Sequence, residues 1–149
     1  MIRIKAVDAE NLLDVCQLTT NQDSIGGAAA GHFYCNAVSI AEAKYYPEMH
    51  PNAIYHNNLL IGFFMYQRLE NQAETATIRR FMIDDRFQQK GLEEKAFEQI
   101  LRGLKIQGVK KVVLVIDPAN ETAKKLCLSF RLHLSGEIHQ AECRYELEL

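Results

Sequence analysis

The chain has 149 residues, of which 48% are apolar and 24% are charged, as expected for one globular domain spanning residues 1–149. The net charge of −2, with lysine and arginine scattered along the chain, argues against a nucleic-acid partner, which needs a clustered basic face. No long apolar run and no signal-peptide core follow Met1, so we expect a cytoplasmic protein without a membrane segment.

The N-terminal part predicts one strand and two helices. Residues 2–7 alternate apolar and polar side chains as a half-buried strand does, and Asp8 then offers an N-cap for a short helix. The glycine- and alanine-rich run 21–33 predicts either a mobile loop or a short helix with frayed ends. Ser39 is expected to cap a second helix, with Glu42 as its capping-box partner.

Three antiparallel strands are expected next. The β-rich runs 53–56 and 59–66 are joined by Asn57-Asn58, which is a hairpin signal. A polar segment then leads to a third strand over residues 75–83. These strands precede the first long helix.

The C-terminal half alternates helices and strands. Apolar residues at spacings of three and four predict a helix over about residues 90–107 that packs on a sheet. The β-branched run 109–116 predicts a strand covered on both faces and parallel to the strand over 75–83. The remaining predicted elements are a helix over 120–130 and strands over 132–135 and 143–149.

The loop between the strand over 75–83 and the long helix is the most informative segment. It carries Gly91 directly before the helix. Backbone N–H groups at a helix N-terminus have no intrahelical partner and lie at the positive end of the helix dipole, so a loop there can wrap an anion. Strand, glycine-bearing loop and helix together predict a pyrophosphate site, and therefore a nucleotide-like cofactor.

Two segments resemble motifs of a known family. The run Arg80–Glu93 resembles a Gln/Arg-x-x-Gly-x-Gly/Ala pyrophosphate loop, and Asn120–Cys127 resembles an Asn-x-x-Ala-x-x-Leu-Tyr helix. With the order of the predicted elements, these motifs resemble the GNAT superfamily of acyl-CoA-dependent N-acetyltransferases over almost the whole chain. Within it, residues 80–91 and 39–43 are most similar to the bacterial spermine/spermidine acetyltransferases.

The resemblance implies an α/β (α+β) architecture, the GNAT acyl-CoA N-acyltransferase fold. Its mixed central sheet would have about seven strands, with helices on both faces. The strands over 75–83 and 109–116 would splay apart and leave strand N–H and C=O groups for a ligand.

The resemblance also implies acetyl-CoA as co-substrate and direct transfer to an amine. A neutral amine attacks the thioester, a backbone N–H stabilises the oxyanion, and an acid protonates the leaving thiolate. Main-chain groups of Met82 and Ile83 would pair with the pantetheine arm, residues 88–93 would donate N–H groups to the pyrophosphate, and Cys127 stands at the position of the catalytic acid. The implied cofactor-binding residues are Met82, Ile83, Gln88, Gln89, Lys90, Gly91, Leu92, Glu93, Asn120 and Ala123.

The pyrophosphate loop departs from the family pattern at two positions. Glu93 stands where the last glycine or alanine is usual, and Gln89 replaces a common glycine. A carboxylate about 5 Å from a phosphate charge costs on the order of 3 kcal/mol at an effective dielectric near 20 if it faces the site. If it points outward, it complements the helix dipole instead.

Three further departures bear on catalysis. Cys127 replaces the usual tyrosine and is either the acid or an inert core thiol, because a thiol of ordinary pKa could protonate a CoA thiolate. Arg131 replaces a glycine after the same helix. Arg79 lies near the position where polyamine-directed relatives have an acidic residue, which removes a candidate base.

Other titratable residues give weaker signals. The five histidines have no metal-ligand spacing and the four cysteines are expected to be reduced, so we predict no metal. Glu42, Glu48, Asp84 and Asp85 are candidates to line an amine pocket, although Asp84-Asp85 equally suits a turn.

The leading hypothesis is an N-acetyltransferase that moves an acetyl group from acetyl-CoA to a primary amine, with a polyamine such as spermine or spermidine as the specific candidate. The alternative is a catalytically degenerate GNAT-fold protein that binds CoA or serves in regulation. A third possibility is a CoA-independent interaction domain, in which Glu93 itself fills the anion site. The resemblance also implies a homodimer.

Overall fold

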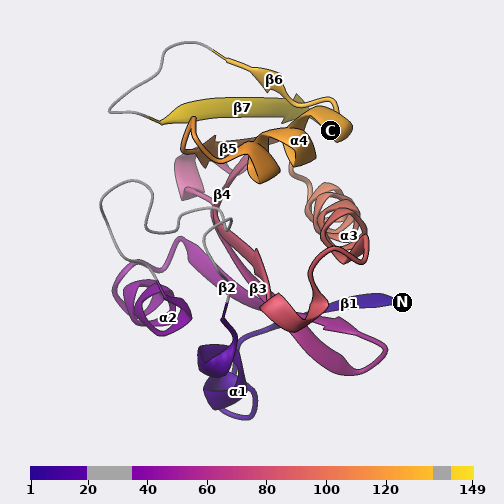
Figure 1. Ribbon diagram of the computed structural model, residues 1–149. Helices are drawn as coiled ribbons and strands as arrows, with labels where there is room; N and C mark the ends of the chain where they lie inside the picture. The colour runs from indigo at the N-terminus through magenta and orange to yellow at the C-terminus, as the bar shows by residue number, and fades with distance from the viewer. Residues whose placement is uncertain (20–34, 136–141) are drawn as a thin grey trace.

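Figure 1 shows the computed structural model, which describes residues 1–19, 35–135 and 142–149. The strands form one seven-stranded sheet in the order β1-β2-β3-β4-β5-β7-β6. The strands are β1 (Ile2–Ala6), β2 (Met49–His56), β3 (Leu59–Gln67), β4 (Thr75–Ile83), β5 (Lys111–Ile116), β6 (His133–Leu134) and β7 (Cys143–Glu148). The α-helices are α1 (Leu12–Gln17), α2 (Asn36–Tyr45), α3 (Leu92–Ile106) and α4 (Glu121–Ser129).

The pairing of the strands confirms the predicted mixed sheet. β1 to β4 pair antiparallel in chain order, β4 and β5 are parallel, and β7 is antiparallel to both β5 and β6. The hairpin between β2 and β3 turns at Asn57 and Asn58, whose φ angles are +50° and +67°. Two consecutive positive φ angles suit the right-handed twist of a two-residue hairpin, and asparagine tolerates them.

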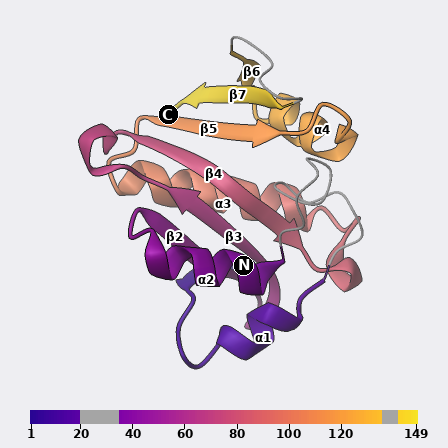
Figure 2. The same cartoon turned by 90° about the vertical axis from the view of Figure 1, so that its left-hand side faces the viewer.

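Helices cover both faces of the sheet, as predicted. One apolar cluster joins Val15 of α1 to alternate sheet residues such as Phe63 and Met65. The other joins α3 and α4 to the opposite sheet face, which carries Phe64 and Leu114. Figure 2 shows α2 in front of the sheet and α3 behind it. The α1/α2 face and the α3/α4 face are therefore separate environments for a ligand.

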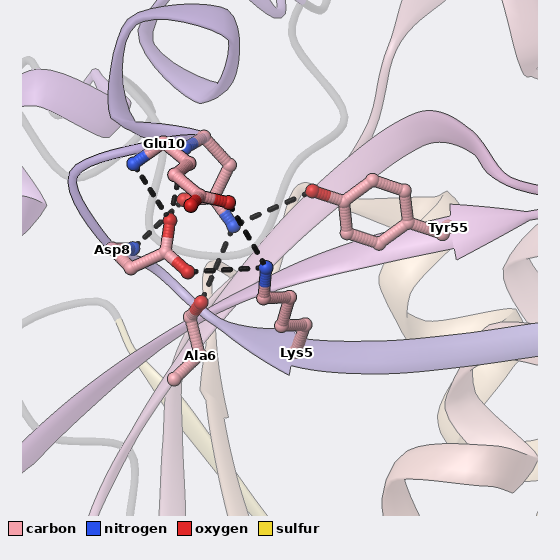
Figure 3. Close-up of polar contacts among 6 residues, drawn as sticks. Lys5, Ala6, Asp8, Glu10 and Tyr55 are labelled. Carbon is pink, nitrogen blue, oxygen red and sulfur yellow. Dashed lines mark hydrogen bonds and ion pairs between the residues drawn. The ribbon is translucent and has the colours of Figure 1, made fainter.

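The turn between β1 and α1 differs from the prediction. α1 begins at Leu12, and Asp8 does not cap it; the Asp8 carboxylate instead accepts a hydrogen bond from the backbone N–H of Asn11 (3.0 Å). Figure 3 shows the Asp8 carboxylate also contacting the Lys5 ammonium, at 3.2 Å. The predicted N-cap was wrong because Asp8 closes an Asx-type turn ahead of the helix.

α2 also begins earlier than predicted. The helix starts at Asn36, so Ser39 lies inside it and the predicted capping box with Glu42 is wrong. The Asn36 side chain donates a hydrogen bond to the Val15 carbonyl oxygen (2.9 Å), which ties the start of α2 to α1. This tertiary contact, which local sequence does not encode, fixes the helix start. The predicted loop over 21–33 lies outside the described residues.

Candidate active site

The site begins where β4 separates from β5. The two strands pair only from Thr75 opposite Lys111 to Ile78 opposite Leu114, although β4 continues to Ile83. Figure 2 shows them diverging beyond that point. The expected splay between these strands is therefore present, and it opens toward the C-terminal ends of both strands.

A β-bulge in β4 coincides with the separation. Met65 of β3 is opposite Arg80, but the next residue, Tyr66, is opposite Ile78, so Arg79 has no opposite residue on β3. A bulge bends its strand and increases the local twist. Because the bulge directly follows the last residue paired with β5, it explains why β4 turns away there.

The last residues of β4 form the floor of the site. Met82 and Ile83 are buried, and their side chains pack toward opposite faces of the sheet. Gly62 lies opposite Ile83, and a Cβ atom at Gly62 would collide with the Met82 carbonyl oxygen. The sequence analysis missed Gly62, although an isolated glycine inside a strand signals a close backbone approach.

The loop after β4 is anchored at its start by Asp84. This buried carboxylate accepts hydrogen bonds from the backbone N–H groups of Thr19 and Arg86 (both 3.0 Å) and from the Arg86 guanidinium (2.8 Å). Burial alone would raise the pKa of Asp84, but the hydrogen bonds from Arg86 and Thr19 outweigh it and lower the pKa. These contacts favour the turn interpretation of Asp84 over the amine-pocket interpretation.

The rest of the loop brings several predicted cofactor-binding residues together. The Gln88 side chain donates a hydrogen bond to the Ile83 carbonyl oxygen (2.9 Å), so the loop folds back onto the end of β4. Gln89 and Gly91 adopt positive φ angles of 61° and 73°, which shape the loop directly before α3. Lys90 is exposed between them, whereas Leu92 is buried in the core.

Glu93 lies in the first turn of α3, directly after this loop, and its side chain is half-buried. Partial burial raises the pKa of Glu93, while hydrogen bonds from the backbone N–H groups of Glu93 and Gln89 act in the opposite direction. Backbone N–H groups at this helix start are also the groups that would bind a pyrophosphate. Contact with them equally suits complementation of the helix dipole, so the orientation of Glu93 toward the site stays a prediction.

The predicted residues of α4 have structural roles of their own. The Asn120 side chain accepts a hydrogen bond from the backbone N–H of Ala123 (3.0 Å) and so caps the helix. Cys127 is fully buried, and burial raises the pKa of its thiol to about 12. Arg131 has a φ angle of +63°, which explains why a glycine suits that position.

On the α1/α2 face, Arg80 extends from β4 toward α2. Its Nε donates to the Ser39 hydroxyl (3.2 Å), and its Nη2 lies 3.8 Å from the Glu42 carboxylate. Glu42 is therefore already neutralised by an arginine. The sequence analysis considered Glu42 for an amine pocket but missed this arginine contact.

A separate cavity of about 460 Å³ lies between β1 and α3 and is also lined by residues of β2 and β3. None of the predicted site residues lines it, so this cavity is distinct from the β4/β5 site. No group of three or more potential metal ligands occurs among the described residues. Within the same part of the chain, every helix is too short or too polar to cross a membrane.

Known proteins share this architecture and sequence pattern. The chain is 27% identical over 143 residues to the spermine/spermidine N(1)-acetyltransferase of Bacillus subtilis (strain 168), covering 92% of this chain and 91% of the relative. The crystal structure of an acetyltransferase from Thermus thermophilus superposes with a TM-score of 0.77 at 18% identity, covering 99% of this chain and 97% of that one.

A second solved structure is a putative acetyltransferase from Salmonella typhimurium with its cofactor acetyl-CoA. It has a TM-score of 0.68 and 14% identity, covering 99% of this chain and 94% of that one. Residues 17–130 of the chain match the family described as Acetyltransferase (GNAT) family. This match covers most of the sequence, and the chain therefore belongs to the GNAT acetyltransferase family.

Proposed function

We propose that this GNAT protein transfers the acetyl group of acetyl-CoA to a primary amine. The observation that supports this best is the separation of β4 from β5 after Ile78, next to a loop with positive φ angles at Gln89 and Gly91. The diverging strands expose backbone hydrogen-bonding groups, and the loop precedes a helix N-terminus. The residues therefore fit a ligand with an amide-containing arm and a pyrophosphate.

Specific residues would hold acetyl-CoA in this site. Main-chain groups of Met82 and Ile83 would pair with the pantetheine arm, and the N–H groups of residues 88–93 would bind the pyrophosphate. The Asn120 side chain is a further candidate for the arm. In the reaction, the amine nitrogen forms a bond to the acetyl carbon, the thioester bond breaks, and one proton passes from the amine to the thiol side.

Glu93 makes cofactor binding weaker in this proposal. Its carboxylate must leave the loop N–H groups, or become protonated, before a pyrophosphate can use them. Because the carboxylate and the phosphates carry like charges, the loop would not hold the ionised Glu93 carboxylate and a pyrophosphate at the same time. The protein would therefore bind acetyl-CoA more weakly than a relative with glycine or alanine at this position.

Cys127 is the candidate donor of the proton that the leaving thiolate takes up. A thiol with a pKa of about 12 holds its proton too strongly to be an efficient donor at neutral pH. The role of Cys127 as the acid stays a prediction, and burial supports the alternative of a core thiol. If Cys127 is the acid, Cys127→Ala should lower kcat by about 10²-fold or more; if it is a core thiol, kcat should change little.

The residues of the site indicate less about the acceptor amine than about acetyl-CoA, the acetyl donor. A polyamine is the candidate that the Bacillus subtilis relative provides through its name. A second function, a GNAT-fold protein that binds CoA without turnover, is favoured by the half-buried carboxylate of Glu93 next to the loop and the burial of Cys127.

Turnover distinguishes these two functions. The protein would be incubated with acetyl-CoA and with spermidine, spermine, 1,5-diaminopentane or 6-aminohexanoate, and both free CoA and the acetylated amine would be measured by mass spectrometry. An acetylated product in proportion to released CoA supports the enzyme. Acetyl-CoA binding with no product from any amine supports the binding protein, and no binding contradicts both.

A further inference from the structure

Arg79 has a charge that the described residues do not neutralise. Its half-buried side chain donates two hydrogen bonds, from Nε (3.0 Å) and Nη2 (2.6 Å), to the same side-chain oxygen of Gln67. That oxygen belongs to a neutral carboxamide. Among residues 1–19, 35–135 and 142–149, no carboxylate forms an ion pair with Arg79. A guanidinium that is partly removed from water is stabilised by an anion beside it, so this arginine is a candidate position for an anion.

Glu42, a carboxylate of α2, already contacts the arginine next to Arg79. Arg80 follows Arg79, its side chain is only 13% exposed, and it lies 3.8 Å from the Glu42 carboxylate. Arg80 also donates to the Arg79 carbonyl oxygen (2.8 Å), which holds the bulge. Arg80 therefore already offsets the charge of Glu42, which weakens the attraction of Glu42 for a cationic acceptor.

The cations and carboxylates of the neighbouring strands balance one another. Register places Glu146 of β7 opposite Val113 of β5, on the sheet face away from α3 and α4. Lys111 lies 2.7 Å and Arg144 lies 3.6 Å from the Glu146 carboxylate. Glu148 lies opposite Lys111 on the same face, so the two carboxylates and the two cations of β5 and β7 balance, and Arg79 stays without a carboxylate partner among the described residues.

The position of Arg79 relates it to the reacting atoms. The Cα atoms of Arg79 and Met82 are about 10 Å apart at the usual strand rise, and the Arg79 guanidinium lies farther from Met82 than this because it bonds to Gln67, opposite Thr77. A linear acceptor with about five methylene groups between an amine and a carboxylate is about 7 Å long, and a hydrogen bond of about 3 Å at each end extends its reach to about 13 Å. An acceptor could therefore reach both points at once.

From these observations we infer that the acceptor carries an anionic group and that Arg79 binds it. The substrate class is then an amine with a carboxylate or similar anion at the far end of its chain, and not an unmodified polyamine. Arg79 acts as a residue that determines specificity, because it contacts the acceptor at a distance from the bond that forms. This inference rests on the proposed function.

Binding of matched acceptors to the complex with CoA tests the inference without requiring turnover. The protein saturated with CoA would be titrated with 6-aminohexanoate, with hexylamine, which has the same amine but no carboxylate, and with spermidine. We expect 6-aminohexanoate to bind at least about tenfold more tightly than either amine, as a charge-assisted hydrogen bond allows. The comparison uses the natural chain and depends on no variant.

Substitutions at Arg79 test whether this residue causes the preference for 6-aminohexanoate. Arg79→Gln should remove it while leaving CoA affinity unchanged, and Arg79→Lys should retain part of it. Arg102→Gln is the matched control, since Arg102 is an exposed arginine on α3 that pairs with Glu98 at 3.5 Å. Equal or tighter binding of hexylamine or spermidine would overturn the inference and leave the proposed function intact. Absence of CoA binding would overturn the proposed function, and the inference with it.

Discussion

In the proposed site, the Glu93 carboxylate would compete with a pyrophosphate for backbone N–H groups. Glu93 lies in the first turn of α3, where burial raises its pKa and the backbone N–H groups of Glu93 and Gln89 act in the opposite direction. In the chain without ligand this arrangement satisfies donors that the helix itself cannot pair. The same arrangement would oppose an anionic ligand, so we expect the affinity for acetyl-CoA to depend on the charge of this one side chain.

Glu93→Gln should therefore tighten acetyl-CoA binding by about tenfold to a hundredfold, because it removes a negative charge beside the phosphates. Titration calorimetry measures this. Glu94→Gln is the matched control, since Glu94 is the exposed neighbour in the same helical turn. Equal affinities for the two variants would contradict the predicted orientation of Glu93.

The pH dependence of acetyl-CoA binding should also differ between the natural chain and Glu93→Gln. The pKa of Glu93 is raised, so its carboxylate is neutralised at a higher pH than an ordinary glutamate. As the pH falls toward that value, the natural chain should gain affinity for acetyl-CoA relative to Glu93→Gln. Titration of the ligand phosphates is common to both proteins and cancels in the comparison. A constant ratio of affinities from pH 8 to pH 5 would contradict this.

At the residue scale, the sequence indicated where the loop of the site lies in the chain better than it indicated the burial and contacts of individual side chains. Spacing located the loop and the helix start, and the structure brings Gln88 back onto Ile83. The burial of Cys127 and the contact between Arg80 and Glu42 depend on distant parts of the chain meeting. Local patterns carry no signal for such contacts, so these environments could not be predicted.

At the scale of elements, the close approach of β3 and β4 fixes the floor of the site. Gly62 allows it, since a Cβ atom there would meet the Met82 carbonyl oxygen. Gly62→Ala should lower the free energy of unfolding by about 1–3 kcal/mol and weaken acetyl-CoA binding, because the end of β4 must move. Urea unfolding and titration with acetyl-CoA measure the two effects.

Gly103 provides the matched control for this substitution. It lies inside α3, and a Cβ atom there would meet nothing within 4 Å. Gly103→Ala should stabilise the protein by up to about 1 kcal/mol through helix propensity, with acetyl-CoA binding unchanged. If Gly62→Ala were as stable as Gly103→Ala, the close approach would not be a constraint on the site.

Elements with strong periodicity were predicted from sequence and those set by contacts were not. The apolar stripe of α3 and the β-branched run of β5 correspond to the observed elements within two residues at each end. α2 begins three residues before Ser39 because Asn36 bonds to the Val15 carbonyl oxygen in α1. A capping pattern alone could not locate that start, since the competing contact comes from another helix.

At the scale of the whole molecule, the Glu146 carboxylate of β7 links β5 to the residue that follows β6. Hydrogen bonds from Lys111 and Ser135 hold the pKa of Glu146 at about 2, below its ordinary value of 4.5. Because the pKa of Glu146 is lower in the folded chain than in the unfolded chain, its carboxylate stabilises the fold at pH values above about 4.5. This stabilisation is lost as the pH falls from about 4.5 to about 2.

Glu146→Gln should remove this pH-dependent contribution. We expect a loss of about 1–2 kcal/mol of unfolding free energy at neutral pH, after allowing for solvent screening, and little difference from the natural chain near pH 2. Glu148→Gln, at an exposed position of the same strand, is the control. A constant difference across this pH range would contradict the role of Glu146.

The order of elements predicted the family fold because each element had its own local signal. Charge did not predict the acceptor in the same way, because the contacts of Arg79 and Arg80 are set only when β3, β4 and α2 come together. Arg79 at the bulge, which has no carboxylate partner among the described residues, argues for an acceptor with an anionic group. Net charge alone could not have indicated it.

The most direct test of the central claim, that the β4/β5 site binds acetyl-CoA, is a calorimetric titration of the natural chain and of Glu93→Gln with acetyl-CoA at moderate salt. Saturable one-to-one binding below millimolar ligand, tighter for Glu93→Gln, is the predicted result. No binding by either protein at millimolar acetyl-CoA would contradict the claim, because removing the competing charge would then have revealed no site.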